Sequence, residues 1–434
     1  MKQPALTNKK VTGVIWVGPI FSASGYGSVT RNFLRGFKEI GFPVKAVNIR
    51  PAKWGNSDEE LLDPETFREI DELTKTDPGA YPVVVINSLP EAYSSIVCKN
   101  IVAKVGCTIF ETDRIPKNWV DICNKLNEVW VPSRFNLQTF TESGVYLNKV
   151  KVFPYGVNTN FFKPIEDKVL IKNKKRFSFL YVSFFNYRKG FDLLLEAYLK
   201  EFTSNDDVSL IIKTGFAGHN MDPKKDGAYF RNLILNLIKG RVDLSNKELP
   251  HFEIITEPFD EQKLRALYNT CDLYISTDRA NGWGMPCMEA MSMGKPAATI
   301  DWSGSMEFMK DGNSLLIKPT GKLIPVDDHL SSNPIYKGHK WAEVTVDEVR
   351  RVMRYSYENQ AELLEIGRKG MECVRDDYSL ARSAEKIKDY LLSIQIKNDL
   401  NGKPRVNISF AKRIIAKLRR LIRGSLLIRP LVKQ

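Results

Sequence analysis

A glycine-flanked tryptophan precedes a short apolar segment in NGWGMPCMEAMSMGKP, residues 281–296. Gly282 and Gly284 let the backbone turn tightly, so that N–H groups can face a ligand. Pro286 suits the first turn of a helix, and a helix N-terminus favours anions because its first N–H groups are unpaired. We therefore expect the backbone of residues 283–285 to bind an anion or a sugar hydroxyl.

Glu289 falls in the first turns of the same expected helix. A carboxylate at this place can accept two hydrogen bonds from the vicinal hydroxyls of a ribose. The alternative is that it only compensates the helix dipole, an effect of about 0.3–1 kcal/mol. The methionines of this segment are expected in the core.

A second loop, in SFFNYRKGFDLLLEAY, presents Arg188 and Lys189 directly before Gly190 and an amphipathic segment. The dipole of a helix does not favour a cation at its N-terminus. The placement makes sense where the cation and the dipole share an anionic ligand. A solvated lysine is the alternative.

A third loop, GPIFSASGYGSVTRNF, carries Gly25 and Gly27 before a helix start that includes Ser28 or Thr30. This arrangement suits a phosphate or a sugar, although a turn needed only for packing remains open. Thr30 stands where a dinucleotide fingerprint has its third glycine, and the second strand ends in AVNIR without an acidic residue. The sequence thus argues against a nicotinamide oxidoreductase.

Short β-rich runs alternate with longer amphipathic stretches, which is typical of parallel α/β construction. The alternation pauses at the charged segment 163–176 and then restarts. We expect two Rossmann-like doubly wound domains facing a cleft, with ligands beyond the carboxyl ends of the strands. The expected parts are an N-terminal Rossmann-like domain at 1–165, a C-terminal Rossmann-like domain at 166–385, and a C-terminal helix with a basic tail at 386–434.

The composition agrees with a two-domain enzyme. A chain of 434 residues exceeds one ordinary core, and 43% apolar with 26% charged residues is typical of a globular protein. The six cysteines form no C-x-x-C pair, which argues against a disulfide framework or a structural zinc site and favours a reducing cytoplasm. No apolar run is long enough for a signal sequence or a membrane span.

Ten basic and no acidic residues lie from Asn401 to the end, and they account for most of the net charge of +13. At helical spacing, the apolar and basic residues of 410–423 fall on opposite faces. We expect residues 408–424 to lie on an anionic membrane surface, where each Lys or Arg contributes about 1 kcal/mol. A helix docked on the protein body is the alternative. Nucleic acid is not expected, because the tail does not interleave aromatic residues for stacking.

As a set, these segments resemble the retaining glycosyltransferases of the two-Rossmann GT-B fold, called group 1 or family 4. The resemblance covers residues 11–395. It rests on the run G-W-G-M-P-x-x-E-A-M-x-x-G-x-P, on FNYRKGFDLLLEAY, EVWVPSRFN and KVKVFPYGVNTNFFKP, and on the N-terminal glycine loop.

The resemblance implies a nucleotide-sugar donor in the C-terminal domain and a glycan or lipid-linked acceptor in the N-terminal domain. It implies no metal and no cofactor, and retention by front-side attack in which the leaving phosphate draws the acceptor proton. Synthesis of cell-surface polysaccharide or glycolipid at the inner face of the plasma membrane would follow. The residue roles it implies are the following: Lys189 and Arg188 at the diphosphate, Glu289 at the ribose, Gly282, Gly284 and Met285 around the sugar, Trp283 as a wall of the donor pocket, and Gly25 and Gly27 closing over the diphosphate.

Three departures from the family pattern bear on activity. Asn281 stands where the family usually has a glutamate, and it can hydrogen-bond sugar hydroxyls without adding a charge. Ser183 and Phe184 occupy the positions of a usual arginine. Glu111 replaces a histidine common in the acceptor region, and its D-x-D-like run with Asp113 is not expected to bind metal. These departures leave open a weak or inactive relative that serves as a partner or scaffold.

Overall fold

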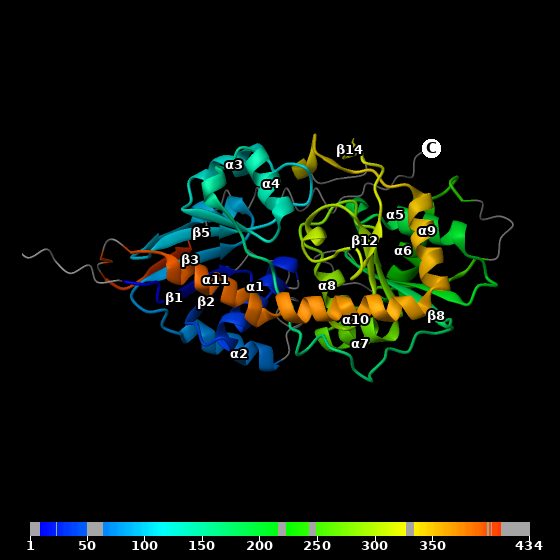
Figure 1. The fold of residues 1–434 in the computed structure, drawn as a ribbon, viewed down its shortest axis with the longest axis horizontal. Helices are drawn as coiled ribbons and strands as arrows, with labels where there is room; N and C mark the ends of the chain where they lie inside the picture. Colours follow the sequence, from blue (N-terminus) through cyan, green and yellow to red (C-terminus); the bar gives the residue numbers. More distant parts are fainter. Residues whose placement is uncertain are drawn as a thin grey trace, which may run out of the picture.

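Two parallel six-stranded sheets form the protein, each flanked by helices (Figure 1). The computed structural model describes residues 9–22, 24–49, 64–215, 223–242, 249–326, 334–396, 399–400 and 402–408. The N-terminal sheet has the order β2-β1-β3-β5-β6-β7, and the C-terminal sheet has the order β10-β9-β8-β11-β12-β13. The expected architecture of two doubly wound sheets is confirmed.

The first half of the chain alternates strands and helices as the sequence predicts. The strands are buried on both faces because helices cover the sheet, which explains their continuous apolar runs. Its elements are β1 Gly13–Gly18, α1 Gly25–Glu39, β2 Val44–Asn48, α2 Pro64–Lys75, β3 Pro82–Asn87, η2 Pro90–Ser95, β4 Ile96–Lys99, β5 Ala103–Cys107, α3 Lys117–Asn124, β6 Glu128–Val131, α4 Arg134–Glu142, η3 Leu147–Lys149 and β7 Val150–Val152.

The segment 163–176 contains neither helix nor strand, and the alternation then resumes. The second sheet and the helices between its strands are β8 Phe177–Val182, η4 Tyr187–Lys189, α5 Phe191–Glu201, β9 Val208–Lys213, α6 Pro223–Leu237, β10 His251–Ile255, α7 Glu261–Thr270, β11 Leu273–Ser276, α8 Met285–Ser292, β12 Ala297–Ile300, η5 Gly304–Glu307 and β13 Leu315–Ile317.

The described residues that follow β13 belong to neither sheet. Its elements are β14 Leu323–Pro325, η6 Pro334–Tyr336, β15 Lys340–Ala342, α9 Val346–Glu358, α10 Gln360–Asp377, α11 Leu380–Ser393 and β16 Arg405–Ile408.

The long C-terminal helices bring the chain back to the N-terminal sheet (Figure 1). After α10, the chain bridges Val157 through Ser379, and α11 packs against α1. A Cβ at Gly36 of α1 would lie 2.5 Å from the carbonyl oxygen of Leu380, so only glycine allows this approach. The boundary at 385 proposed from the sequence therefore falls inside a helix that packs on the N-terminal half.

A strap formed by residues 334–342 joins the two halves on another side. Tyr336 and His339 pack their rings against Phe110, which follows β5 of the N-terminal sheet. Thr112 hydrogen-bonds His339 Nδ1 at 2.8 Å, and the backbones of Asp113 and Lys340 meet at 3.1 Å. The sequence gives no prediction of this strap.

The expected membrane tail is described only at its start. β16 pairs antiparallel with β4, which places residues 405–408 at the N-terminal half. Residues 409–434, and with them nearly all of the segment 408–424, lie outside the described residues. Among the helices that the structure does describe, none combines the length and apolarity needed to cross a membrane.

Candidate functional site

In each sheet there is one point at which the order of the strands reverses. Such points form crevices beyond the carboxyl ends of the strands. In the C-terminal sheet this point lies between β8 and β11. A Cβ at Gly190, which has φ +63°, would lie 2.1 Å from the carbonyl oxygen of Thr277, and the Thr277 hydroxyl donates to Gly190 O at 2.9 Å. The loops that follow β8 and β11 are therefore in direct contact.

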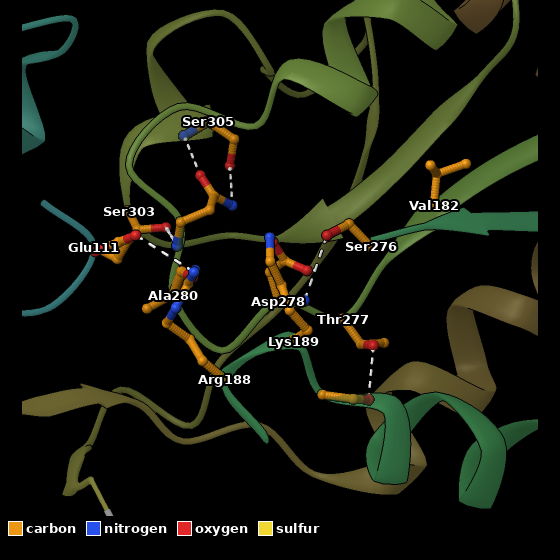
Figure 2. Close-up of polar contacts among 12 residues, drawn as sticks. Glu111, Val182, Arg188, Lys189, Ser276, Thr277, Asp278, Ala280, Ser303 and Ser305 are labelled. Atoms are coloured by element: carbon orange, nitrogen blue, oxygen red, sulfur yellow. Dashed lines mark hydrogen bonds and ion pairs between the residues drawn. The ribbon is translucent and has the colours of Figure 1, made fainter. Parts of the chain in front are cut away.

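Lys189, expected at the diphosphate, lies in this crevice. Its Nζ is 2.5 Å from Oδ2 of Asp278, which follows β11 (Figure 2). The Tyr181 hydroxyl donates to Asp278 Oδ1 at 2.8 Å. Asp278 was not identified from the sequence, although a charged residue directly after a buried strand was a usable signal.

Arg188 and Glu111, expected at the donor and the acceptor, come together from the two halves of the molecule (Figure 2). Arg188 Nη2 lies 3.4 Å from Glu111 Oε1, and its Nη1 donates to the carbonyl oxygen of Ala280 at 2.6 Å. The Tyr336 hydroxyl donates to Glu111 Oε2 at 3.0 Å, and its ring lies below the guanidinium. The strap thus supplies a third member of this contact.

Asn281 is buried, and its side chain holds a neighbouring loop. Its Oδ1 accepts from the backbone N–H of Ser305 at 3.1 Å, and its Nδ2 lies 3.4 Å from the hydroxyl of the same serine. The Ser303 hydroxyl accepts from the Asn281 N–H at 3.1 Å. Both ends of the carboxamide are therefore engaged within the protein, and the sugar contact that the sequence suggested stays a prediction.

Gly282 and Gly284 make close approaches of different kinds. A Cβ at Gly282 would lie 2.6 Å from Ile109 Cδ1 of the N-terminal half. Gly284 has φ +92° and precedes α8, which begins at Met285. The glycine loop and the helix N-terminus thus stand where the two halves meet.

The side chain of Trp283 corrects the sequence interpretation. Its ring is 3% exposed and packs against Tyr155, Phe308 and Tyr378, with centroids 5.1–6.1 Å apart. The turn at the glycines directs the ring inward, into the apolar core beside α8. Trp283 is therefore a core side chain here and not an exposed wall of the donor pocket.

Glu289 lies on α8 and accepts a hydrogen bond from the Tyr268 hydroxyl at 2.7 Å. Burial raises the pKa of Glu289 to about 8, since desolvation penalises the carboxylate, and nearby Glu261 adds repulsion. The hydrogen-bond partner of this buried carboxyl group is a neutral hydroxyl and not a cation. A ligand hydroxyl that donates to it would favour the charged form.

The N-terminal glycine loop lies beyond the carboxyl end of β1. Ser24 caps α1 by accepting from the N–H of Gly27, so the helix begins at Gly25, earlier than Ser28 or Thr30. A Cβ at Gly27 would lie 2.0 Å from the Ser22 carbonyl oxygen, whereas Gly25 is exposed with open space around it. The loop is therefore built by close packing at one glycine only.

Two arginines that the sequence reasoning missed hold these loops. Arg31 is buried and donates to the carbonyl oxygens of Ile20 and Ser22 at 2.9 Å each. Arg279 donates to both carboxylate oxygens of Asp192 at 2.8 and 2.7 Å. Each follows or precedes a glycine loop, but burial was needed to recognise its role.

The described residues contain no cluster of three or more His, Cys, Asp or Glu side chains suited to a metal ion. In the D-x-D-like run, Glu111 contacts Arg188 while Asp113 contacts Arg114, so their carboxylates have separate partners.

The family model described as glycosyl transferases group 1 matches residues 162–329, which contain the loops that follow β8 and β11. Mannosylfructose-phosphate synthase of Agrobacterium fabrum is 25% identical over 178 residues, 40% of this chain. The match spans 37% of that synthase, so it covers only part of the relative.

Solved structures share the whole architecture. HepE of Anabaena, in complex with UDP and glucose, has a TM-score of 0.56 and 14% identity, over 88% of this chain and all of that chain. Sucrose-phosphate synthase of Thermosynechococcus elongatus has a TM-score of 0.57 and 13% identity, over 87% of this chain and 98% of that one. At these identities the comparison establishes the fold alone. The chain therefore has the GT-B fold, and its residues 162–329 match the family model of the group 1 glycosyl transferases.

Proposed function

We propose that this protein is a glycosyltransferase that moves a sugar from a nucleotide-sugar to a glycan or lipid-linked acceptor, with retention of anomeric configuration. The observation that carries the proposal is the contact between the two halves beside Lys189. Arg188, the neighbour of Lys189, contacts Glu111 of the N-terminal half, and Gly282, before α8, approaches Ile109 of the same half. The UDP and glucose held by HepE, a protein of the same fold, support a nucleotide-sugar as the donor.

In this proposal the C-terminal crevice binds the donor. Lys189 and the N-terminus of α8 stabilise the charge that develops on the leaving diphosphate. Glu289 accepts hydrogen bonds from the ribose. The backbone around Gly282 and Gly284 contacts the sugar, with the acceptor on the side of Glu111 and the loop at Gly25 and Gly27. No metal or other cofactor is required.

Release of a nucleoside diphosphate tests the proposal. The full chain is incubated with a panel of nucleotide-sugars and lipid or glycan acceptors, and the anomer of the product is determined by NMR. We expect turnover with one donor, and at least a hundredfold loss in Lys189→Ala and Glu289→Ala, on the order of what single charge-stabilising contacts contribute. Full activity in both variants would contradict the site.

A second candidate is a catalytically weak relative that acts as a partner or scaffold. Asn281 favours it, because its carboxamide is committed to Ser305 and no carboxylate stands at that position. Asn281→Glu separates the two: a large gain in turnover indicates decayed chemistry, whereas a loss indicates that the asparagine suits the donor of this enzyme.

We also propose peripheral attachment to an anionic membrane through residues 408–424, which suits a lipid-linked acceptor and a role at the inner face of the plasma membrane. The support is the charge pattern of the sequence, together with β16, which ties the preceding residues to the N-terminal half. Deletion of residues 409–434 should abolish co-sedimentation with phosphatidylglycerol vesicles at low salt. Unchanged sedimentation would count against attachment.

A further inference from the structure

The lysine expected to bind the diphosphate already has a carboxylate partner. The Lys189 and Asp278 side chains are 19% and 7% exposed, and the Tyr181 hydroxyl shares its one proton between the Asp278 carboxylate and the carbonyl oxygen of Lys189, at 2.8 and 2.6 Å. Burial and hydrogen bonding hold this pair in one geometry. It is therefore a fixed part of the crevice and not a surface ion pair.

The charged side chains of the crevice are paired with one another. Lys189 is matched by Asp278, and the neighbouring cation Arg188 is matched by Glu111 at 3.4 Å. These four groups together carry no net charge. At short range in a partly buried site, a carboxylate repels a phosphate about as strongly as a lysine attracts it. A diphosphate therefore gains less from this lysine than it would from an unpaired one.

We propose that Asp278 determines specificity at the donor site by neutralising Lys189. Inorganic phosphate, diphosphate or a released nucleoside diphosphate then binds weakly, while a nucleotide-sugar binds because its nucleoside and sugar add contacts. The inference rests on the proposed function for the identity of the donor, but the charge effect itself does not. Specificity is here a difference in affinity, reached by weakening the contact that the competitors share.

Asp278→Asn in the full chain tests the inference. The substitution removes the charge, keeps the shape and leaves an oxygen that can accept from Tyr181. Titration calorimetry with inorganic pyrophosphate and with UDP should show Kd falling about tenfold for each, which corresponds to about 1.4 kcal/mol. Uridine, which lacks phosphate, should bind with unchanged affinity.

Asp272→Asn is the matched control. Asp272 precedes the same strand at its opposite end, and it lies 3.7 Å from Lys174. Asp272→Asn therefore removes one negative charge beside a lysine, as Asp278→Asn does, but away from the crevice. It should leave pyrophosphate binding unchanged. Asp278→Ser is a second variant that also removes the charge, should the asparagine protein fail to fold.

A double-mutant cycle locates the effect. The gain from Asp278→Asn should persist in a Lys189→Ala background, because the carboxylate repels the phosphate whether or not the lysine is present. The inference is overturned if neither Asp278 variant binds pyrophosphate more tightly than the unchanged protein does. Asp278 would then be a residue that only positions the lysine. A gain in pyrophosphate binding without turnover on any nucleotide-sugar would instead count against the proposed function alone.

Discussion

Glu289 is a carboxylic acid that burial keeps protonated near neutral pH, with a pKa of about 8. Its protonation links the site to stability. The unfolded chain loses this proton near pH 4.5, whereas the folded protein keeps it until about pH 8. Between these values the folded state binds more protons, so the contribution of Glu289 to stability is full below pH 4.5 and falls as the pH rises.

Glu289→Gln should therefore stabilise the protein at pH 8 and have little effect at pH 5. The glutamine does not titrate and can still accept from the Tyr268 hydroxyl. The pKa shift of Glu289 corresponds to at most about 4–5 kcal/mol at pH 8, and about 1 kcal/mol raises the melting temperature by about 2–4 °C in a domain of this size. We therefore expect the melting temperature at pH 8 to rise by several degrees. Differential scanning calorimetry across this pH range measures the difference.

Glu253→Gln serves as the control for this prediction, since Glu253 is exposed on β10. It should show no difference between pH 5 and pH 8. If Glu289→Gln and the unchanged protein melt at the same temperature at both pH values, the raised pKa of Glu289 is contradicted.

At the scale of elements, the loop between β11 and α8 is fixed by an ion pair to another element. Arg279 is 8% exposed and Asp192 on α5 is 2% exposed. The guanidinium also donates to the carbonyl oxygen of Tyr187 at 2.8 Å and lies 4.1 Å from the centroid of its ring. This arrangement ties the loop of Asp278 and Asn281 to the loop of Lys189.

Arg279→Ala should cost about 3–5 kcal/mol, because it leaves the buried Asp192 carboxylate without its bidentate partner. Urea unfolding followed by circular dichroism measures the loss. Arg241 contacts the same carboxylate at 3.4 Å, but its side chain is 48% exposed. Arg241→Ala should therefore cost less than about 1 kcal/mol. Equal losses in the two variants would refute the distinction.

At the scale of the whole molecule, α11 and the strap join the two halves on different sides. The helix reaches α1 only because Gly36 lets the Leu380 backbone approach it. The strap adds the contacts of Tyr336 and His339 with the loop after β5. The two halves are therefore joined by segments distant in sequence.

Gly36→Ala should destabilise the protein by about 1–3 kcal/mol, the usual cost of overpacking, because the new methyl group meets backbone that cannot turn aside. Hydrogen exchange should rise in α11 before it rises in the C-terminal sheet. Gly227→Ala in α6 is the control, since its nearest neighbour would lie 3.9 Å away. It should be neutral or stabilise by up to about 1 kcal/mol. Unchanged exchange in α11 would show that the contact is not needed.

Most strands of both sheets could be predicted from the sequence, because a strand that is buried on two faces has a continuous apolar run. The loops of Lys189, Gly25 and Gly282 could be found for a similar reason, since glycine and charge after a strand are local signals. Trp283 could not be placed correctly, because the direction of its ring depends on Tyr155 and Phe308, which lie far from it in the chain.

The sequence by itself determined the alternation of elements, the glycine loops and the basic tail, all of which are patterns within short stretches of chain. Only the tertiary structure decided the partners: Asp278 beside Lys189, Glu111 beside Arg188, and Ser305 on the Asn281 carboxamide. The reason is physical. A charge or an amide has its effect through the group it meets at about 3 Å, and that group comes from another loop or from the other half of the molecule.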